Sequence, residues 1–403
     1  MRNVFRELHS GQSPKVAERV RHSIDYKLLA CKAFAVWREA RRCLSKIYMV
    51  SECHARTSDH NGAAVRLAII GDVHGDWDSS EDGQALQALN CDAAVFVGDF
   101  NEEDIPLVHE IAAVNSPPKA VVLGNHDAWT CLTNWSIKKF KDRLPSGDSS
   151  IYSEVEEQLQ ILGADHVGYT HKHFKAADGT QFAIVGGRPF SKGGHRWTDC
   201  EDFYMRFYKV PDMETSAMRI AETVLNLPEG VVPILAAHNG PTNLGNSAWS
   251  ISGVDFKPGG GDHGDWDLEL ALQHVHAAGR KVPMVVFGHM HERLKGTSVL
   301  RDMVAVDAST GTVYLNAAVV PRVRQIEVNG QPALARHFCI AELCHGHVQH
   351  LSNVWMSRGE DGSFTANKQL LLERASSSQG HGQVQWYRIW RGHTREHEVI
   401  HLL

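Results

Sequence analysis

The sequence predicts an α/β protein, a sandwich in which mixed sheets are flanked by helices. Short apolar runs alternate with helical stretches between residues 65 and 123, and the alternation resumes between residues 231 and 287. Each of the first three runs ends in a Gly followed by a polar residue. This pattern is typical of parallel strands, whose carboxyl ends lie at one edge of a sheet and form binding sites there.

The first part of the alternation predicts three strands separated by two helices. The expected strands are Val65–Ile70, Ala93–Val97 and Ala120–Leu123, and the expected helices lie near Gly83–Leu89 and Asp104–Val114. The middle of the chain is less regular. It predicts a helix over Ile151–Leu162, a hairpin over Phe174–Val185 that turns at Asp178-Gly179, and a mostly helical stretch over Trp197–Leu227.

The second part of the alternation predicts strands over Val231–Ala236 and Val282–Phe287, with a helix over Leu268–Ala278 between them. Four further strand-like runs follow, at Val304–Val306, Thr312–Leu315, Val319–Val328 and Phe338–Leu343. We therefore expect one domain over residues 65–356. Residues 357–403 are polar, and we expect them to form a C-terminal appendage.

Residues 1–64 have a different composition. They are rich in arginine, with scattered serines, as organelle transit peptides are, but they also carry acidic residues, which such peptides lack. The acidic residues are Glu7, Glu18, Asp25, Glu39, Glu52 and Asp59. Both a targeting segment and a helical or disordered arm are compatible with this composition.

The overall composition is that of an ordinary soluble protein, with 43% hydrophobic and 22% charged residues. The net charge of −6 gives no basic field for nucleic acid or an anionic membrane. No stretch reaches the roughly 18–20 apolar residues that a membrane span needs. The 8 cysteines form no CxxC pair, which favours reduced thiols in an intracellular compartment, the cytosol or a plastid.

Five short motifs with metal-ligand side chains follow five of the expected strands. They are Gly71-Asp-Val-His-Gly75, Gly98-Asp-Phe-Asn-Glu102, Gly124-Asn-His-Asp127, His238-Asn-Gly-Pro241 and Gly288-His-Met-His291. One such motif is weak evidence, because a strand-end Asp is often a helix N-cap and a single His is often only hydrogen-bonded. Five in one chain indicate a common site. Their carboxylate, amide and imidazole donors suit Mn, Fe, Zn or Mg.

The order of these motifs resembles that of the calcineurin-like metallophosphoesterase superfamily, which has the series D-x-H, G-D-x-x-D, G-N-H-D/E, a lone His, and G-H-x-H. The resemblance covers about Val65 to Asn316. It implies the α/β sandwich of that superfamily and two divalent metal ions. One ion would be held by Asp72, His74, Asp99 and His291, and the other by Asp99, Asn125, His238 and His289.

The resemblance also implies a mechanism. Two cations about 3.5–4 Å apart acidify a bridging water and bind both the attacking and the leaving oxygens of an in-line displacement. His126 would be the general acid that protonates the leaving group. Asp127 is a further expected catalytic residue. Its being Asp rather than Glu fits the branches that act on small molecules and nucleotides better than the protein phosphatases.

The second motif departs from the protein-phosphatase branch. That branch continues with an Asp that orients the catalytic His and an Arg that binds phosphate, whereas this chain has Glu102 and Glu103. We expect Glu102 to orient His126 over a longer reach. Glu103 cannot bind phosphate, so activity on phosphoproteins is not expected.

Two segments are candidates for substrate binding. Arg188, in Gly186-Gly-Arg-Pro-Phe190, could supply the phosphate contact, or it could be a surface turn residue. In the Gly-rich acidic loop before Leu268, which resembles that of a cyanobacterial and plant lineage, Asp262, His263 and Asp265 could reach the rim of the site. Asp265 or Asp267 could instead cap the following helix, and Asp267 is the favoured cap.

The expected function is hydrolysis of a small-molecule phosphoester, either a diester or a monoester. A non-catalytic scaffold of the same fold is one alternative, but such relatives typically lose ligand or acid histidines, and this chain keeps all five of them. A nuclease is the other alternative. The acidic net charge and the lack of a basic stripe count against it.

Overall fold

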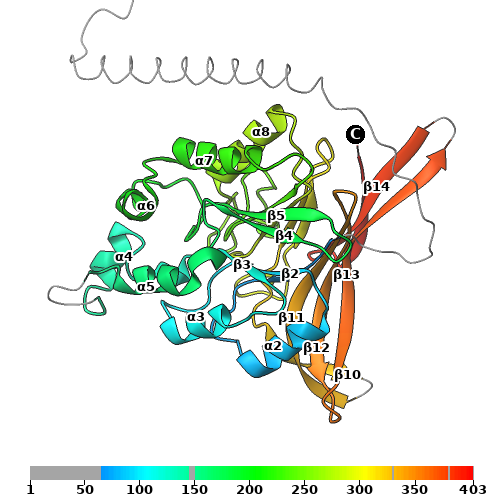
Figure 1. Ribbon diagram of the computed structural model, residues 1–403, viewed down its shortest axis with the longest axis horizontal. Coiled ribbons are helices and arrows are strands. Elements are labelled where there is room, and N and C mark those ends of the chain that lie inside the picture. The colour runs from blue at the N-terminus through cyan, green and yellow to red at the C-terminus, as the bar shows by residue number, and fades with distance from the viewer. Residues whose placement is uncertain (1–64, 145–149, 329–330, 380–381, 403) are drawn as a thin grey trace, which may run out of the picture. The chain divides into compact units, whose positions relative to one another are not determined.

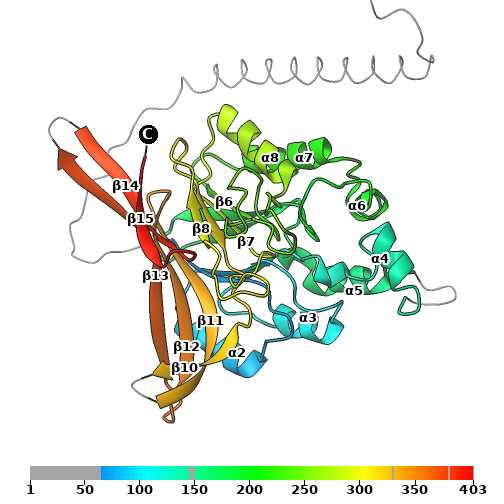
Figure 2. The ribbon, with the colours of Figure 1, turned by 180° about the vertical axis from the view of Figure 1, so that it is seen from behind.

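The computed structural model describes residues 65–144, 150–328, 331–379 and 382–402, which belong to one compact unit. The expected N-terminal extension, residues 1–64, lies outside the described residues. Figures 1 and 2 show that the described part contains two sheets, with helices beside them. The α/β sandwich expected from the sequence is confirmed.

The first sheet has nine strands and the second has six. The strands of the first sheet are β1 (Val65–Ile70), β2 (Ala93–Phe96), β3 (Lys119–Val121), β10 (Val323–Val328), β11 (Gln331–Cys344), β12 (His347–Arg358), β13 (Phe364–Gln379), β14 (Gly382–Arg391) and β15 (Glu396–His401). Those of the second are β4 (His171–Lys175), β5 (Gln181–Gly186), β6 (Val232–Ala236), β7 (Met284–Phe287), β8 (Val304–Val306) and β9 (Val313–Asn316).

Helices connect many of these strands. The α-helices are α2 (Ser79–Ala88), α3 (Ile105–Ala112), α4 (Asn134–Lys139), α5 (Ser153–Leu162), α6 (Glu201–Tyr208), α7 (Met213–Leu225) and α8 (Trp266–Ala277). Two short 3-10 helices are η1 (His126–Ala128) and η2 (Gly163–Asp165). In Figure 1, α2 and α3 lie near the first sheet and α7 and α8 near the second.

Both sheets are mixed. β1, β2 and β3 are parallel, as the sequence predicts, and β1 pairs on its other side with β11 in the antiparallel direction. In the second sheet β5, β6, β7 and β9 are parallel, and β4 and β8 are antiparallel edge strands. The carboxyl ends of β1, β2, β3, β6 and β7 therefore carry the five motifs.

The core has two layers because the central strands are buried on both faces. In β1, Leu67 and Ile69 belong to a cluster that also contains Ile184 of β5 and Val286 of β7, so this layer lies between the sheets. Ile70 belongs to a second cluster, which it shares with apolar residues of the helices. Burial on both faces explains why the central strands are continuous apolar runs.

The C-terminal residues continue the first sheet. The expected boundary between residues 356 and 357 falls within β12, and β13, β14 and β15 follow it as antiparallel neighbours. In Figures 1 and 2 the β13–β14 hairpin projects beyond the other strands. The strands β13, β14 and β15 are therefore part of the sheet that carries three of the five motifs.

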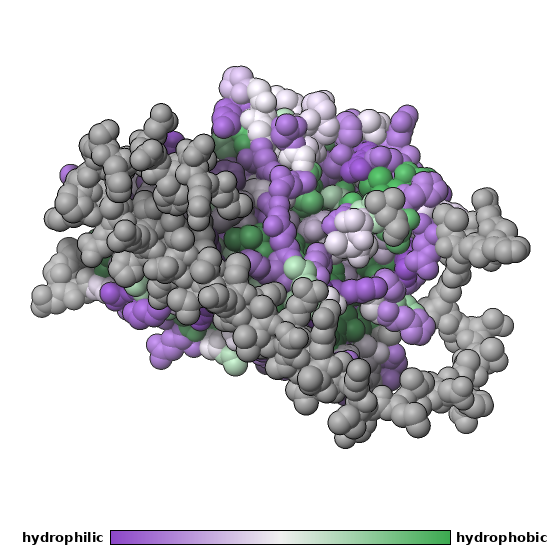
Figure 3. Space-filling view, turned by 90° about the horizontal axis from the view of Figure 1, so that it is seen from above, coloured by the Kyte–Doolittle hydropathy of each residue, from purple (hydrophilic) through white to green (hydrophobic). Residues whose placement is uncertain are grey.

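The surface of the described part shows no single apolar face in the view of Figure 3, where hydrophilic residues separate smaller hydrophobic areas. Among the described residues, no helix is long and apolar enough to cross a membrane. The five cysteines in the described ranges have free thiols: Cys91, Cys131, Cys200, Cys339 and Cys344.

Candidate metal centre

The loops after the strands that carry the site have unusual backbone conformations. Asp72, His74, Asp99 and His289 are non-glycine residues with φ values of 27°, 46°, 51° and 69°. This left-handed region is costly for residues with a Cβ, and it persists only where the surrounding structure imposes it. Four of the seven expected ligands therefore lie in strained turns, which is common at functional sites.

Glycines allow these loops to approach one another. A Cβ on Gly124 would lie 2.4 Å from Oδ1 of Asp99, and one on Gly288 would lie 2.1 Å from Oδ1 of Asp72. Contacts this short are not possible for any other residue. The glycines of the third and fifth motifs thus serve to bring neighbouring loops against the carboxylates.

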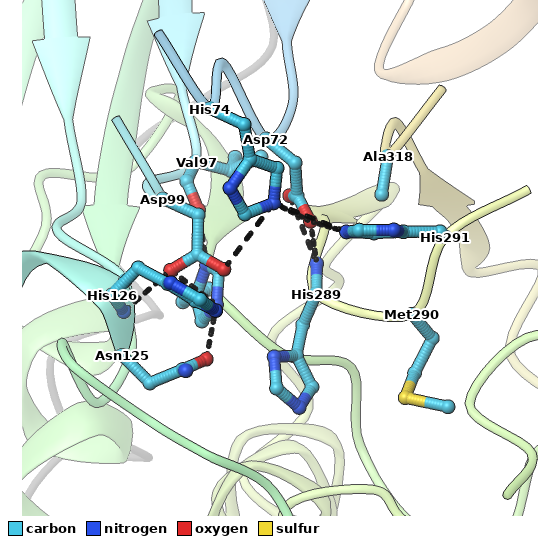
Figure 4. A network of polar contacts seen from close by, with 12 residues as sticks. Asp72, His74, Val97, Asp99, Asn125, His126, His289, Met290, His291 and Ala318 are labelled. Carbon is cyan, nitrogen blue, oxygen red and sulfur yellow. Dashed lines mark hydrogen bonds and ion pairs between the residues drawn. The ribbon is translucent and has the colours of Figure 1, made fainter. Parts of the chain in front are cut away.

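The side chains of the first set of expected ligands lie close together (Figure 4). The Nε2 atoms of His74 and His291 are 3.1 Å apart, and Nε2 of His291 is 3.3 Å from Oδ2 of Asp72. Nε2 of His74 is 4.0 Å from Oδ2 of Asp72 and 4.0 Å from Oδ2 of Asp99. Two imidazoles and two carboxylates thus direct their donor atoms toward a common point.

The second set converges on the other oxygen of Asp99. Nε2 of His238 lies 3.3 Å from Oδ1 of Asp99 and 3.0 Å from Oδ1 of Asn125. Nδ1 of His238 is 2.7 Å from the carbonyl of Val97, to which it can donate. With the Nδ1 proton donated to Val97, Nε2 faces two oxygens, and this arrangement needs either a second proton on Nε2 or a cation between the three atoms. His289 completes this group.

The electrostatics of the two sets are dominated by Asp99. Burial lowers the pKa of His238, but the Asp99 carboxylate and its hydrogen bond outweigh burial and raise it to about 10. Burial likewise opposes ionisation of Asp99, yet the surrounding imidazoles hold its pKa well below the usual range. Asp99 is therefore an ionised carboxylate, as a metal ligand must be. The donor set fits a dinuclear metal site.

Asp127 links the loops of the second and third motifs through hydrogen bonds. Its side chain is fully buried and accepts hydrogen bonds from the backbone N–H groups of Asp99 at 3.1 Å, Phe100 at 2.9 Å and Gly124 at 2.7 Å. Asp127 was expected among the catalytic residues. Its carboxyl group holds together the loops that present Asp99 and Asn125.

His126 lies beside the donor atoms and is oriented by an aromatic ring. Its backbone N–H donates to Oδ1 of Asp99 at 2.8 Å, and its ring centroid is 5.0 Å from that of His74. The imidazole stacks on the indole of Trp129, with centroids 4.2 Å apart and an interplanar angle of 11°. Trp129 was missed in the sequence, where its only signal is its position three residues after His126.

The expectation that Glu102 orients His126 is not met. The Glu102 carboxylate accepts a hydrogen bond from Nη2 of Arg143 at 2.9 Å, in a partly exposed ion pair. Its neighbour Glu103 is buried and accepts hydrogen bonds from the N–H and Oγ1 of Thr130 at 2.6 and 2.8 Å. Burial raises the pKa of Glu103 to about 7.

This buried carboxyl gives a pH-dependent prediction. The ordinary pKa of Glu is 4.5, so Glu103 is protonated in both states below pH 4.5 and costs nothing there. As the pH rises from 4.5 through 7, the unfolded state loses the proton more readily, and the folded state is destabilised by up to about 3 kcal/mol. Glu103→Gln keeps the acceptor but cannot ionise. It should therefore raise the unfolding free energy at pH 8 more than at pH 5.

Urea unfolding of metal-free protein at the two pH values measures this difference. Glu102→Gln is the matched control, because its partly exposed ion pair is worth only about 0–1 kcal/mol. An equal effect of Glu103→Gln at pH 5 and pH 8 would contradict the prediction.

Arg188 is buried and its guanidinium is bound by two carboxylates, so neither expectation for it is met. It is 3% exposed, so it is not a surface turn residue. Its Nε and Nη2 donate to Asp267 at 3.0 Å and to Asp265 at 2.7 Å, so its guanidinium is already occupied by two carboxylates rather than free for phosphate. Ser191 also donates to Asp265, at 2.7 Å. Arg188 and the two Asp residues form a buried ion cluster.

The expectations for the acidic loop also need correction. Asp265 is buried in the ion cluster with Arg188 and does not reach the rim. It is the N-cap residue of α8, although its side chain makes no capping hydrogen bond, and Asp267 lies inside the helix. Asp262 accepts backbone N–H bonds from Asn243 at 2.6 Å and Gly264 at 2.8 Å, so its carboxylate shapes the loop. His263 of the same loop stacks on His289, with centroids 5.7 Å apart.

The buried cluster predicts a large effect on stability. Arg188→Ala leaves two carboxylates buried without their cation, which typically costs about 3–5 kcal/mol. Arg143→Ala is the control, since its ion pair with Glu102 is exposed and its loss should cost less than about 1 kcal/mol. Urea unfolding measures both, and similar losses for the two variants would contradict the burial argument.

The chain belongs to the calcineurin-like phosphoesterase family, which matches residues 65–293. This match confirms the resemblance inferred from the motifs. It supports metal-dependent hydrolysis of phosphoesters as the general activity, and the His/Asp cluster fits two metal ions. No curated protein matches the chain.

Solved structures show only distant likenesses. A dimetal phosphatase from Danio rerio is 11% identical, with 76% of this chain and 99% of that one covered and a TM-score of 0.36. The phosphopantetheinyl hydrolase of Mycobacterium tuberculosis is 14% identical, with 63% and 89% covered and a TM-score of 0.35. Vps29 from Chaetomium thermophilum is 9% identical, with 77% and 97% covered and a TM-score of 0.29.

Proposed function

We propose that the protein hydrolyses a small-molecule phosphoester, a diester or a monoester, with two divalent metal ions and with His126 as the general acid. The observation that supports this most is the position of Asp99. Its Oδ2 faces His74, its Oδ1 faces His238, and the backbone N–H of His126 donates to the same Oδ1. One carboxylate thus links both expected ligand sets and the proton donor.

The ligand sets follow from this arrangement. Asp72, His74, Asp99 and His291 would hold one ion, and Asp99, Asn125, His238 and His289 the other. Bound there, two ions of Mn, Fe, Zn or Mg supply Lewis acidity that lowers the pKa of water and offsets the charge of the phosphoryl oxygens.

Three further residues supply the proton or hold its donor in place. His126 would give a proton from its imidazole to the leaving oxygen, since it is half-buried beside Asp99 and is not needed to complete either ligand set. The stacked indole of Trp129 restricts rotation of the imidazole. Asp127 holds the second and third motifs together through three backbone N–H groups.

The side chains of the second motif argue against phosphoprotein substrates. Glu103 is buried and bonded to Thr130, and Glu102 is paired with Arg143, so this motif offers no cation for a phosphate group. A small phosphoester is therefore the favoured substrate class.

The test is a substrate panel with protein loaded with Mn²⁺, Fe²⁺ or Zn²⁺. We expect turnover of at least one small phosphomonoester or phosphodiester, its loss on chelation with EDTA, and slower turnover of phosphopeptides. Two bound ions with no turnover of any phosphoester would instead indicate a non-catalytic scaffold. A phosphopeptide that is hydrolysed faster than every small ester would overturn the substrate class.

A further inference from the structure

The turn between β14 and β15 packs directly against the segment that follows the fifth motif. A Cβ on Gly392 would lie 2.1 Å from the carbonyl oxygen of Arg301, so only glycine allows this approach. Nδ1 of His393 lies 2.8 Å from Oδ1 of Asp302, and the ring of His393 stacks on Trp249 with centroids 5.3 Å apart. The β14–β15 turn thus contacts both Arg301 and Asp302, which are adjacent in the sequence.

Arg301 carries this contact to the metal centre. Its side chain is fully buried, and its Nε donates to the carbonyl of His291 at 3.0 Å. Its Nη1 donates to the carbonyls of Ala248, Ser250 and Gly253 at 2.9, 2.7 and 2.7 Å. One guanidinium therefore joins the peptide of an expected ligand to the loop over residues 248–253.

The loop over residues 248–253 also contacts Asp302 and the β14–β15 turn. The backbone N–H of Asp302 donates to the carbonyl of Trp249 at 2.9 Å, and Trp249 in turn stacks on His393. The loop is therefore held from one side by Arg301 and from the other by the turn. Movement of His393 would therefore shift Arg301 through Asp302 and Trp249.

His291 is the ligand that most needs such support. Its side chain is 40% exposed, compared with 22% for His74, 3% for Asp99 and 0% for His238. Packing fixes the buried ligands, whereas the orientation of His291 depends more on its backbone. The backbone of this segment is held by Arg301, through the carbonyl of His291 and through an N–H bond to the carbonyl of Glu292 at 2.6 Å.

We propose that the β14–β15 turn is a positioning element of the metal centre. His393 acts through Asp302 and Arg301 to hold His291, and so sets the affinity for the ion that His291 shares with Asp72, His74 and Asp99. This inference rests on the proposed function, because it presupposes that ion. It extends the site to a turn about a hundred residues further along the chain.

The surroundings of His393 show what its imidazole contributes. A cavity of about 280 Å³ lies along it, lined by Trp249, Asp302, Arg391, His393 and Glu398 among others. A side chain shortened at position 393 would enlarge this space. Asp302 would keep the backbone N–H of residue 393 at 3.3 Å and the ion pair with Arg391 at 3.6 Å, so His393→Ala removes the imidazole contact alone.

The test is calorimetric titration of the metal-free full-length protein with Mn²⁺ and with Co²⁺. We expect two binding steps in the wild type, one of which is lost in His291→Ala. His393→Ala should weaken that same step about tenfold, at the lower end of the effect of ligand-supporting partners, and leave the other step unchanged. His393→Asn keeps a donor at the place of Nδ1 and should restore most of the affinity.

His397→Ala is the matched control. His397 lies in β15, and its ring contacts Trp390, away from Asp302, so both binding steps should be unchanged. Far-ultraviolet circular dichroism and the melting temperature of each metal-free variant report whether it folds. A His393→Ala variant that fails to fold is replaced by His393→Asn and His393→Gln, which must differ in the His291-dependent step.

The outcomes separate this inference from the function on which it rests. A wild type that binds no ion overturns the proposed function and the inference with it. Two wild-type steps with His393→Ala indistinguishable from wild type overturn the inference alone. Equal weakening of both steps also overturns it, because that result indicates a general loss of stability. The absorption spectrum of bound Co²⁺ provides a second readout that does not depend on turnover.

Discussion

Replacing His126 with Ala or Gln is expected to leave the metal content intact and to lower kcat by about 10²–10⁴-fold for an ester with a poor leaving group. Asn125, not His126, supplies the oxygen beside His238, so the ligand sets remain complete. For p-nitrophenolate, which departs without a proton, the loss should be much smaller. Steady-state kinetics on matched alkyl and p-nitrophenyl esters, with elemental analysis of each variant, make the comparison.

The contrast between the two leaving groups is decisive. Equal losses on both esters would remove the general-acid role, and loss of metal would make His126 a ligand. Trp129→Phe should retain most of the activity and Trp129→Ala should show a weaker form of the same leaving-group dependence, because the indole only orients the ring. Glu102→Gln should show no such dependence, since its carboxylate pairs with Arg143.

Asp99→Asn is expected to remove both metal ions. The amide lacks the charge that Asp99 places between His74 and His238, and it cannot present two anionic oxygens to the two sets. The loss of both ions should lower kcat/KM by about 10³-fold or more, since metal ions contribute several kcal/mol to stabilisation of the transition state. Elemental analysis after loading and dialysis measures the metal content directly.

His291→Ala provides the comparison for Asp99→Asn. It removes a ligand from one set only and should leave about one ion per chain. Two ions retained in Asp99→Asn would contradict the bridging position of Asp99. One ion lost in each variant would show that the sets are independent.

The sequence predicted the central strands and the motifs well, because both depend on local patterns. β1 has the predicted bounds, Val65–Ile70, since a strand buried on both faces is mostly apolar, and only the partly buried Arg66 departs from this pattern. The motif residues could be placed at strand ends because each motif, with its polar ligand residues, directly follows an apolar run in the sequence. The Gly residues at these turns are visible in the sequence, although the contacts that require them are not.

The C-terminal strands could not be predicted in this way. β13 runs over Phe364–Gln379, and most of its residues from 365 to 369 are polar and exposed, so no apolar period marks it. Its strand conformation comes from pairing with β12 and β14, which is a tertiary effect. A polar composition was therefore interpreted as an appendage.

The partners of individual side chains could not be predicted from the sequence either. Arg188 meets Asp265 and Asp267 across 77 and 79 residues of sequence, and a lone Arg after a strand gives no sign of such partners. Glu102 was expected to reach His126 because of its place in the motif, but Arg143 from after α4 takes its carboxylate. Roles that depend on the approach of a distant segment follow only from the three-dimensional arrangement.

The position of β1 bears on how the chain becomes folded during its synthesis. β1 pairs with β2 on one side and with β11 on the other, and β11 begins at Gln331, more than 260 residues after β1 ends. A ribosome adding about 5–20 residues per second needs at least about 13 seconds to supply this second neighbour. Until then, one edge of β1 presents unpaired backbone groups, which are a template for aggregation. A fragment restricted to residues 65–293 would contain every expected ligand and still keep that edge open. The segment that carries the expected ligands is thus shorter than the segment that pairs both edges of β1.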